Sequence, residues 1–282
     1  MRRLATLCLG LLAALAACEV PFDPIVPSDL VFSFSGYLDA SADTQVVRVE
    51  PVARTAEGEP GRIDAEVTLT DLDSGARVVL AQDVRTFPTG PAHLFRTAAP
   101  IVPGGRYRLV ARRSDGAESA TDVEVPEDDA YSIAVETGRE TCPTSVVITG
   151  AERVVDVQAR YRIFQDGQIV ERRYSHAGTF ERLDDGSLRA KIYYADDAAA
   201  MGLDPLSLAD VISSDLVVAV STSAWPDPVG LSLEDILQIG SVGVDNGLGF
   251  VGGAITERRP FVPGIIKLGF GPTAQTLPCT AR

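Results

Sequence analysis

The sequence predicts a mostly β protein: an N-terminal β-sandwich followed by a second β-rich domain with one or two short helices. Apolar and polar residues alternate in runs of roughly six to nine residues, and turn-forming residues separate the runs about every ten residues. Strands of this length and spacing are typical of sandwiches. With 45% hydrophobic residues, the chain also has enough apolar side chains for a sizeable core.

Three pairs of alternating runs make up the first half of the chain. They cover residues 30–38 and 45–52, 65–72 and 76–82, and 105–113 and 118–125. Asp73-Ser74-Gly75 separates the second pair and Ser114-Asp115-Gly116-Ala117 the third. These residue types tolerate positive φ or hydrogen-bond their own backbone, so both segments are predicted hairpin turns.

The segment Pro103-Gly104-Gly105-Arg106-Tyr107-Arg108-Leu109 resembles the turn-then-strand element of immunoglobulin-like modules. In those modules the tyrosine packs at a sheet corner, so the resemblance implies a structural role for Tyr107. We therefore expect the sandwich to be immunoglobulin-like. The polar, proline-led segment 126–129 follows its last strand and predicts a boundary between a sandwich domain at 30–126 and a C-terminal domain at 130–282.

The second half is β-rich but less regular. Hairpins are predicted about Asp166-Gly167 and about Asp184-Asp185-Gly186, and further strands at 215–225, 249–259 and 264–270. Short helices are predicted at 196–203 and 231–240. In the latter, Ser232 is a candidate N-cap, and acidic residues fill the first turn.

The N-terminus has the pattern of a lipoprotein signal peptide. Arg2 and Arg3 precede an apolar run that is shorter than the roughly 20 residues of a membrane-spanning helix, so residues 1–17 form a predicted signal peptide. Leu15-Ala16-Ala17-Cys18 resembles the bacterial lipobox, which implies that Cys18 is lipidated and becomes the mature N-terminus. Three prolines make residues 18–29 a predicted extended tether. A plain signal peptide with an incidental cysteine is the alternative.

The predicted anchor places the protein at the cell envelope. Several acyl chains together give stable membrane attachment, so a lipidated cysteine needs no transmembrane helix. Glu19 follows Cys18, whereas aspartate favours retention at the inner membrane in proteobacterial lipoproteins. By this analogy we expect a lipid-anchored outer-membrane protein, with the periplasmic or surface face left open.

The composition is strongly acidic. The predicted mature chain of about 265 residues has 23 Lys and Arg against 39 Asp and Glu, a formal charge of −16. This balance argues against nucleic-acid partners and against electrostatic adhesion to anionic lipid, because both require clustered basic residues.

Four cysteines are present, of which Cys8 leaves with the signal peptide and Cys18 carries the lipid. Cys142 and Cys279 remain, and a pair in an exported protein predicts a disulfide. A metal site is the alternative, but His93 and His176 are the chain's only histidines, and neither has a second ligand at zinc spacing. We expect no metal and no cofactor.

Three stretches resemble one family, the uncharacterised outer-membrane lipoproteins of Bacteroidota known as domain-of-unknown-function 4249. The stretches are Cys18 and its tether leading into 31–38 and 45–49, then 65–71 with 103–109 and Ser119-Ala120, and finally the glycine-rich 244–253. The resemblance implies a possible partner, a TonB-dependent outer-membrane receptor, and assigns no catalytic residue. The cysteine- and glycine-rich ending that is frequent in the family is missing here.

Individual motifs give little support to catalysis. Asn246-Gly247-Leu248-Gly249 lacks the phosphate-loop pattern and predicts a tight turn into a closely packed strand. Asp196 and Asp197 are adjacent and predict a helix cap rather than a carboxylate pair, and His176 has no serine in a nucleophile elbow. Trp225 is either an exposed contact residue or a core residue that closes the preceding strand.

These observations favour a non-enzymatic, lipid-anchored binding or accessory protein. A hydrolase acting on envelope polymers or glycans is the first alternative, and it requires two carboxylates about 5–10 Å apart in a cleft. A purely structural envelope lipoprotein is the second.

The lipid anchor is directly testable. Substituting Cys18→Ser is expected to abolish lipidation, because a hydroxyl does not replace the thiolate in forming the thioether. The measurement is incorporation of labelled fatty acid into the precursor. Unchanged labelling of the variant would contradict the anchor.

Overall fold

The computed structural model describes residues 30–52, 61–88, 90–136, 142–176, 179–204, 211–226, 243–268 and 275–278. The signal peptide, Cys18, the tether, Cys279 and the helix expected at 231–240 lie outside these residues, so their predictions stay predictions. No helix within the described ranges is long and apolar enough to cross a membrane.

The protein is mostly β, as predicted, with two large sheets, two smaller ones and one described helix. The eight-stranded sheet has the order β12 (Gln168–Ser175), β11 (Arg153–Gln165), β15 (Val211–Ser221), β17 (Gly247–Phe261), β1 (Phe32–Asp39), β2 (Gln45–Pro51), β6 (Gly90–Thr97), β5 (Ala81–Phe87). The five-stranded sheet has the order β16 (Val244–Asp245), β8 (Glu118–Glu124), β7 (Arg106–Arg112), β3 (Glu66–Asp71), β4 (Arg77–Val79).

The four-stranded sheet has the order β13 (Glu181–Arg182), β14 (Leu188–Ile192), β10 (Thr144–Thr149), β9 (Ser132–Glu136), and β18 (Ile265–Leu268) pairs with β19 (Gln275–Pro278). Helix α2 covers Tyr194–Ala200. It overlaps the helix expected at 196–203 but begins two residues before it and ends three residues before it. The hairpins about Asp166-Gly167 and about 184–186 are confirmed as β11–β12 and β13–β14.

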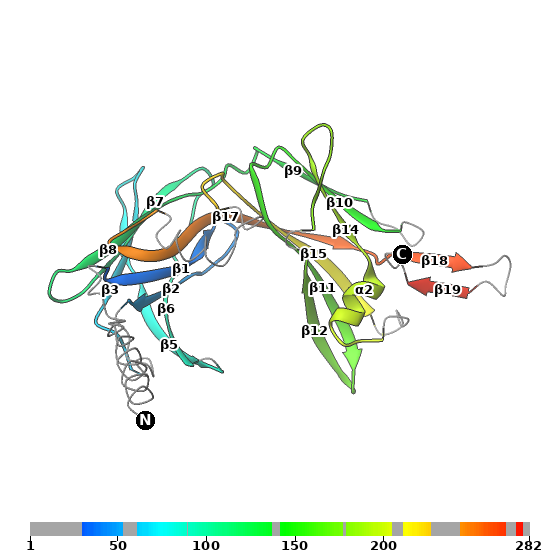
Figure 1. Ribbon diagram of the computed structural model, residues 1–282, viewed down its shortest axis with the longest axis horizontal. Helices are drawn as coiled ribbons and strands as arrows, with labels where there is room; N and C mark the ends of the chain where they lie inside the picture. Colours follow the sequence, from blue (N-terminus) through cyan, green and yellow to red (C-terminus); the bar gives the residue numbers. More distant parts are fainter. Residues whose placement is uncertain are drawn as a thin grey trace, which may run out of the picture.

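One strand belongs to both halves of the molecule. The first part of β17 pairs in parallel with β1, from Phe32 opposite Gly247 to Asp39 opposite Ala254. Its second part pairs antiparallel with β15. Figure 1 shows β17 running from the N-terminal strands into the second half. The expected boundary at 126–129 assigns all later residues to the C-terminal domain. Residues 244–254 belong instead to the N-terminal sandwich, because β16 and the first part of β17 pair with strands of its two sheets.

The run at 76–82, a single predicted strand, is divided between two strands in different sheets. β4 pairs with β3, whereas β5 pairs with β6 in the eight-stranded sheet. Leu80, 4% exposed, lies between them in the core. Leu80 is an apolar residue inside the run and is buried where the chain passes from one sheet to the other. The pattern of apolar residues therefore continues through the break, and alternation alone predicts one continuous strand.

The glycine-rich segment after Asn246 is a turn into a closely packed strand, as predicted. Asn246 has a φ of 50°, and the chain passes there from β16 into β17. A β-carbon on Gly247 or Gly249 would overlap the backbone carbonyl oxygen of Phe32 or Phe34. Glycine at these positions therefore lets the two parallel strands approach.

Tyr107 has the structural role expected from its motif. Its side chain is buried, and its hydroxyl oxygen accepts the backbone N–H of Val102 at 2.7 Å. Burial raises the pKa of this phenol. The tyrosine thus fixes the turn that precedes β7 against the strand itself.

Cys142, two residues before β10, is disulfide-bonded. Cys279 lies outside the described residues, so the Cys142–Cys279 pairing stays a prediction.

The contact between β17 and β1 predicts a large stability difference between two glycine substitutions. Both Gly249 and Gly75 have positive φ, but a β-carbon at Gly75 would meet open space. Gly75→Ala is expected to cost about 1–2 kcal/mol, from backbone conformation alone. Gly249→Ala adds a steric term of about 1–3 kcal/mol because the added carbon strikes backbone. Denaturant unfolding of both variants measures the difference, and equal losses would contradict the close approach.

Candidate functional site

A groove of about 370 Å³ lies across five strands of the eight-stranded sheet. We call it the sheet groove. Its floor includes the small side chains of Val217, Ala219 and Ala254 on β15 and β17. On the neighbouring strand β11, Val157, Ala159 and Tyr161 are buried in the core. Gln158 and Arg160 alternate with them and therefore project from the opposite, groove-bearing face.

Aromatic side chains form one side of the sheet groove. Trp225, just after β15, has its ring centroid 6.2 Å from that of Tyr37 on β1. It also contacts Phe250 edge-on at 5.3 Å. A β-carbon on Gly252 would overlap the indole ring of Trp225, so the absent side chain creates its seat on the sheet. Trp225 is half-buried on this outer face rather than within the core cluster.

Arginines stand at the other side of the groove. Arg160 on β11 is directly opposite Arg173 on the edge strand β12, and both line the groove. Burial lowers the pKa of Arg160, and the charges of Arg173 and Arg258 lower it further. Positive charge therefore collects at this end of the groove.

Two carboxylates also line the groove, and both are engaged by the protein. Oδ1 of Asp39 accepts the backbone N–H groups of Ser41 at 2.9 Å and Thr256 at 3.1 Å. Oδ1 of Asp156 accepts the Ser175 hydroxyl at 2.7 Å. These bonds give Asp39 a structural role in joining the end of β1 to β17.

A buried polar cluster lies on the core side of the same sheet. The Tyr161 hydroxyl donates to Oδ2 of Asp197 at 2.5 Å, and Nε2 of His176 lies 3.3 Å from the same carboxylate. All three residues are at most 5% exposed. Burial, followed by the charge of Asp197, raises the pKa of Tyr161 well above its ordinary value. A cluster closed to solvent in this way holds α2 onto the sheet and does not present itself to a substrate.

The expected capping role of Asp196 and Asp197 is therefore wrong for Asp197. Tyr193 is the N-cap residue and makes no side-chain capping bond. Asp196 is exposed while Asp197 turns into the core, so the two carboxylates do point apart as expected. Asp197 is buried because Tyr161, far away in the sequence, supplies its partner.

His93 is the second buried histidine, and it fastens β6 to β2. Its Nδ1 lies 2.6 Å from Oε2 of Glu50 and its Nε2 2.8 Å from the carbonyl oxygen of Gly61. Arg48 donates to the other oxygen of Glu50 at 2.8 Å. Among the described residues, no group of three or more His, Cys, Asp and Glu side chains is arranged to hold a metal ion.

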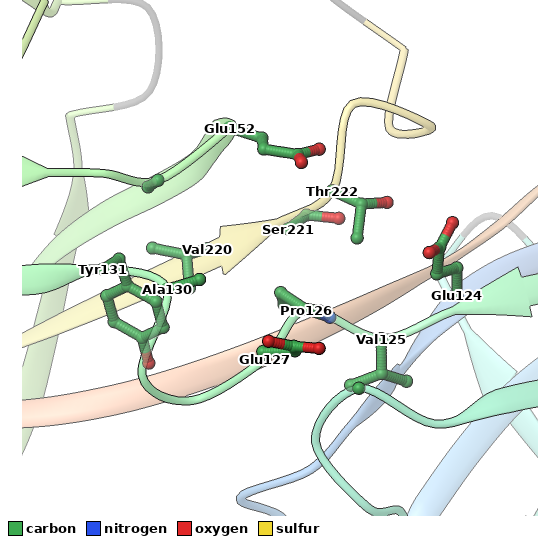
Figure 2. A pocket seen from close by; sticks show the side chains of 12 residues that line it. Glu124, Val125, Pro126, Glu127, Ala130, Tyr131, Glu152, Val220, Ser221 and Thr222 are labelled. Carbon is green, nitrogen blue, oxygen red and sulfur yellow. The ribbon is translucent and has the colours of Figure 1, made fainter.

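A smaller hollow of about 220 Å³ lies beside the connection from β8 to β9 (Figure 2). The carboxylates of Glu124, Glu127 and Glu152 surround it together with Ser221 and Thr222. Glu152 accepts the backbone N–H of Ser223 at 2.8 Å. This hollow is acidic, in contrast to the arginine end of the sheet groove.

Sequence reasoning singled out Trp225 but missed the rest of the sheet groove. Tyr37 lies far from Arg160 and Arg173 in the sequence, and each of the three occupies an ordinary solvent-facing position of a strand. The one available signal was Arg160 and Arg173, in register across the predicted hairpin about Asp166-Gly167.

No protein-family model matches the chain, and no curated protein matches it. Backbone similarity to solved structures is weak. The pullulanase of Anoxybacillus sp. LM18-11 matches at 15% identity and a TM-score of 0.24, over 67% of this chain and 24% of that one. The FN1–FN3 domains of chicken CNTN1 match at 12% identity and a TM-score of 0.24, over 80% of this chain and 62% of that one. Dimeric latent PorU from Porphyromonas gingivalis matches at 10% identity and a TM-score of 0.23, over 92% of this chain and 21% of that one.

The chain thus spans less than two thirds of each of these structures. TM-scores this low carry no functional argument.

The buried tyrosine cluster makes stability sensitive to alkaline pH. Because the pKa of Tyr161 is raised in the folded state, its contribution to stability is present below about pH 10 and is lost as the pH rises. Tyr161→Phe is expected to cost about 1–3 kcal/mol at pH 8, since the buried Asp197 carboxylate loses its donor. The variant should also lose less free energy of unfolding than wild type between pH 8 and pH 11, as measured by urea unfolding.

Tyr193→Phe is the matched control, since Tyr193 is partly exposed at the start of the same helix. We expect it to follow wild type at both pH values. A Tyr161→Phe variant with the wild-type alkaline loss would contradict the role of the cluster.

Proposed function

We propose that the chain is a lipid-anchored cell-envelope protein that binds a ligand or partner at the sheet groove, as an accessory to a TonB-dependent outer-membrane receptor. The observation that carries the binding role is the groove itself. It combines an aromatic side, a small-residue floor and a charged end, and every part is held by a sheet strand or seated on one. Side chains held on paired strands keep their geometry better than side chains on loops.

The anchor and its location rest on sequence. The lipobox ending at Cys18 supports attachment to a membrane, and Glu19 favours the outer membrane. The receptor partner comes from the family resemblance alone. An acidic surface fits a protein held at a membrane by its acyl chains rather than by basic residues.

Binding is favoured over catalysis by the positions of the ionisable groups. His93 and His176 are buried and each contacts a carboxylate inside the protein. The groove carboxylates, Asp39 and Asp156, accept hydrogen bonds from the protein's own backbone and hydroxyl groups. A general acid or base has to reach the reacting atoms of a bound substrate.

The test uses the tagged full-length protein in its own host. After extraction of the membranes in mild detergent, wild type is expected in the outer-membrane fraction together with a TonB-dependent receptor, identified by mass spectrometry. The double variant Tyr37→Ala/Trp225→Ala should remain anchored in the membrane. It should recover at least tenfold less receptor than wild type. The matched control is Phe164→Ala, because Phe164 is an exposed aromatic residue outside the groove.

Three results would contradict this function. Wild-type protein in the soluble fraction would contradict the lipid anchor. Full receptor recovery by the groove variant would contradict the groove as the binding surface. Loss of receptor recovery in Phe164→Ala alone would also contradict it. A deletion strain with a weakened envelope and unchanged uptake would support the purely structural alternative instead.

A further inference from the structure

The arginine end of the sheet groove is electrostatically unusual for this chain. Arg160 and Arg173 face each other across β11 and β12, and like charges directly opposite in a sheet repel. The charge of Arg258 on β17 adds to this repulsion. Three guanidinium groups therefore gather on one face of a protein whose net charge is −14.

Several exposed arginines of the protein are paired with carboxylates. Arg106 pairs with Asp73 at 2.6 Å, and Arg112 pairs with Glu118 at 2.7 Å. Arg160 differs, because its Nε donates to the neutral amide oxygen of Gln158 at 3.1 Å. It makes no salt bridge with another described residue.

Acidic groups nearby offset part of this charge. Glu171 accepts a hydrogen bond from Arg173 at 2.6 Å, and Asp215 is opposite Arg160 on β15. Asp39 and Asp156 lie within the groove but are engaged as described above. The guanidinium of Arg160 is therefore the group best placed to receive an anion from solution.

The rest of the groove narrows the chemistry of the ligand. Trp225 and Tyr37 present aromatic surface, on which a sugar ring can place its C–H face, while Gln158 offers amide donors and acceptors for hydroxyl groups. The volume of about 370 Å³ is at the lower end of the range for small-molecule sites. An arginine fork binds a carboxylate or a comparable oxyanion with paired hydrogen bonds.

We propose that the sheet groove binds an acidic saccharide, with its anionic substituent at Arg160 and Arg173 and a sugar ring against Trp225. The anionic substituent is a carboxylate, as in uronic acids, or a sulfate ester. This inference rests on the proposed binding function and adds the class of ligand to it.

Trp225 is the only tryptophan in the chain, so its fluorescence reports directly on this groove. The full-length protein in detergent micelles is titrated with tri-galacturonate, with a sulfated galactotriose and with neutral galactotriose. We expect saturable changes with at least one acidic sugar, at an affinity at least tenfold above that for the neutral one. Affinity should fall as salt is raised from 50 to 500 mM, in line with screening. The tighter of the two acidic ligands identifies the anionic group.

Arg160→Gln/Arg173→Gln is expected to weaken acidic-sugar binding at least tenfold. Arg162→Gln is the matched control, since Arg162 is also on β11 but does not line the groove. A melting curve for each variant checks that it folds, and the salt dependence of wild type tests the charge independently of any variant.

The inference is overturned by equal or tighter binding of the neutral sugar, by salt-independent binding, or by unchanged affinity in the folded arginine variant. The absence of a saturable response to all three sugars also overturns it. None of these results affects membrane anchoring or receptor recovery, so failure here is distinguishable from failure of the proposed function.

Discussion

The backbones of β17 and β1 lie so close that a β-carbon at Gly249 would overlap the carbonyl oxygen of Phe34. This parallel contact joins residues more than 200 positions apart and lets one strand serve both halves of the molecule. Ser119 secures the start of the pair, since its hydroxyl donates to the Asn246 carbonyl and accepts the Phe32 N–H. Without the close approach, the eight-stranded sheet would separate into two smaller ones.

The candidate binding surface follows from this continuous sheet. Tyr37 on β1 and Arg173 on β12 are placed on one groove only because β17, β15 and β11 pair between them. The missing side chain at Gly252 then lets Trp225 pack on the sheet at the aromatic side of the groove, beside Tyr37. The glycines of β17 therefore serve both strand pairing and the shape of the groove.

Polar groups divide between the two faces of the sheet in the second half. On the core side, Tyr161, Asp197 and His176 satisfy one another, as buried polar groups must. On the outer side, Arg160 has a neutral hydrogen-bond partner and lies among both arginines and carboxylates. The same strand, β11, thus supplies a closed structural cluster and an open charged one, because its side chains alternate between faces.

The sequence by itself determined the mostly β class, the hairpins about Asp166-Gly167 and Asp184–Gly186, the short helix and the role of Tyr107, because turn chemistry and alternation act over a few residues. Tertiary structure alone decided that β17 completes the N-terminal sandwich, that the chain changes sheet at Leu80, and that Asp197 is buried rather than a cap. It also decided that Trp225 lies beside Tyr37. These features depend on long-range strand pairing, and local patterns do not encode which distant strand will be the neighbour.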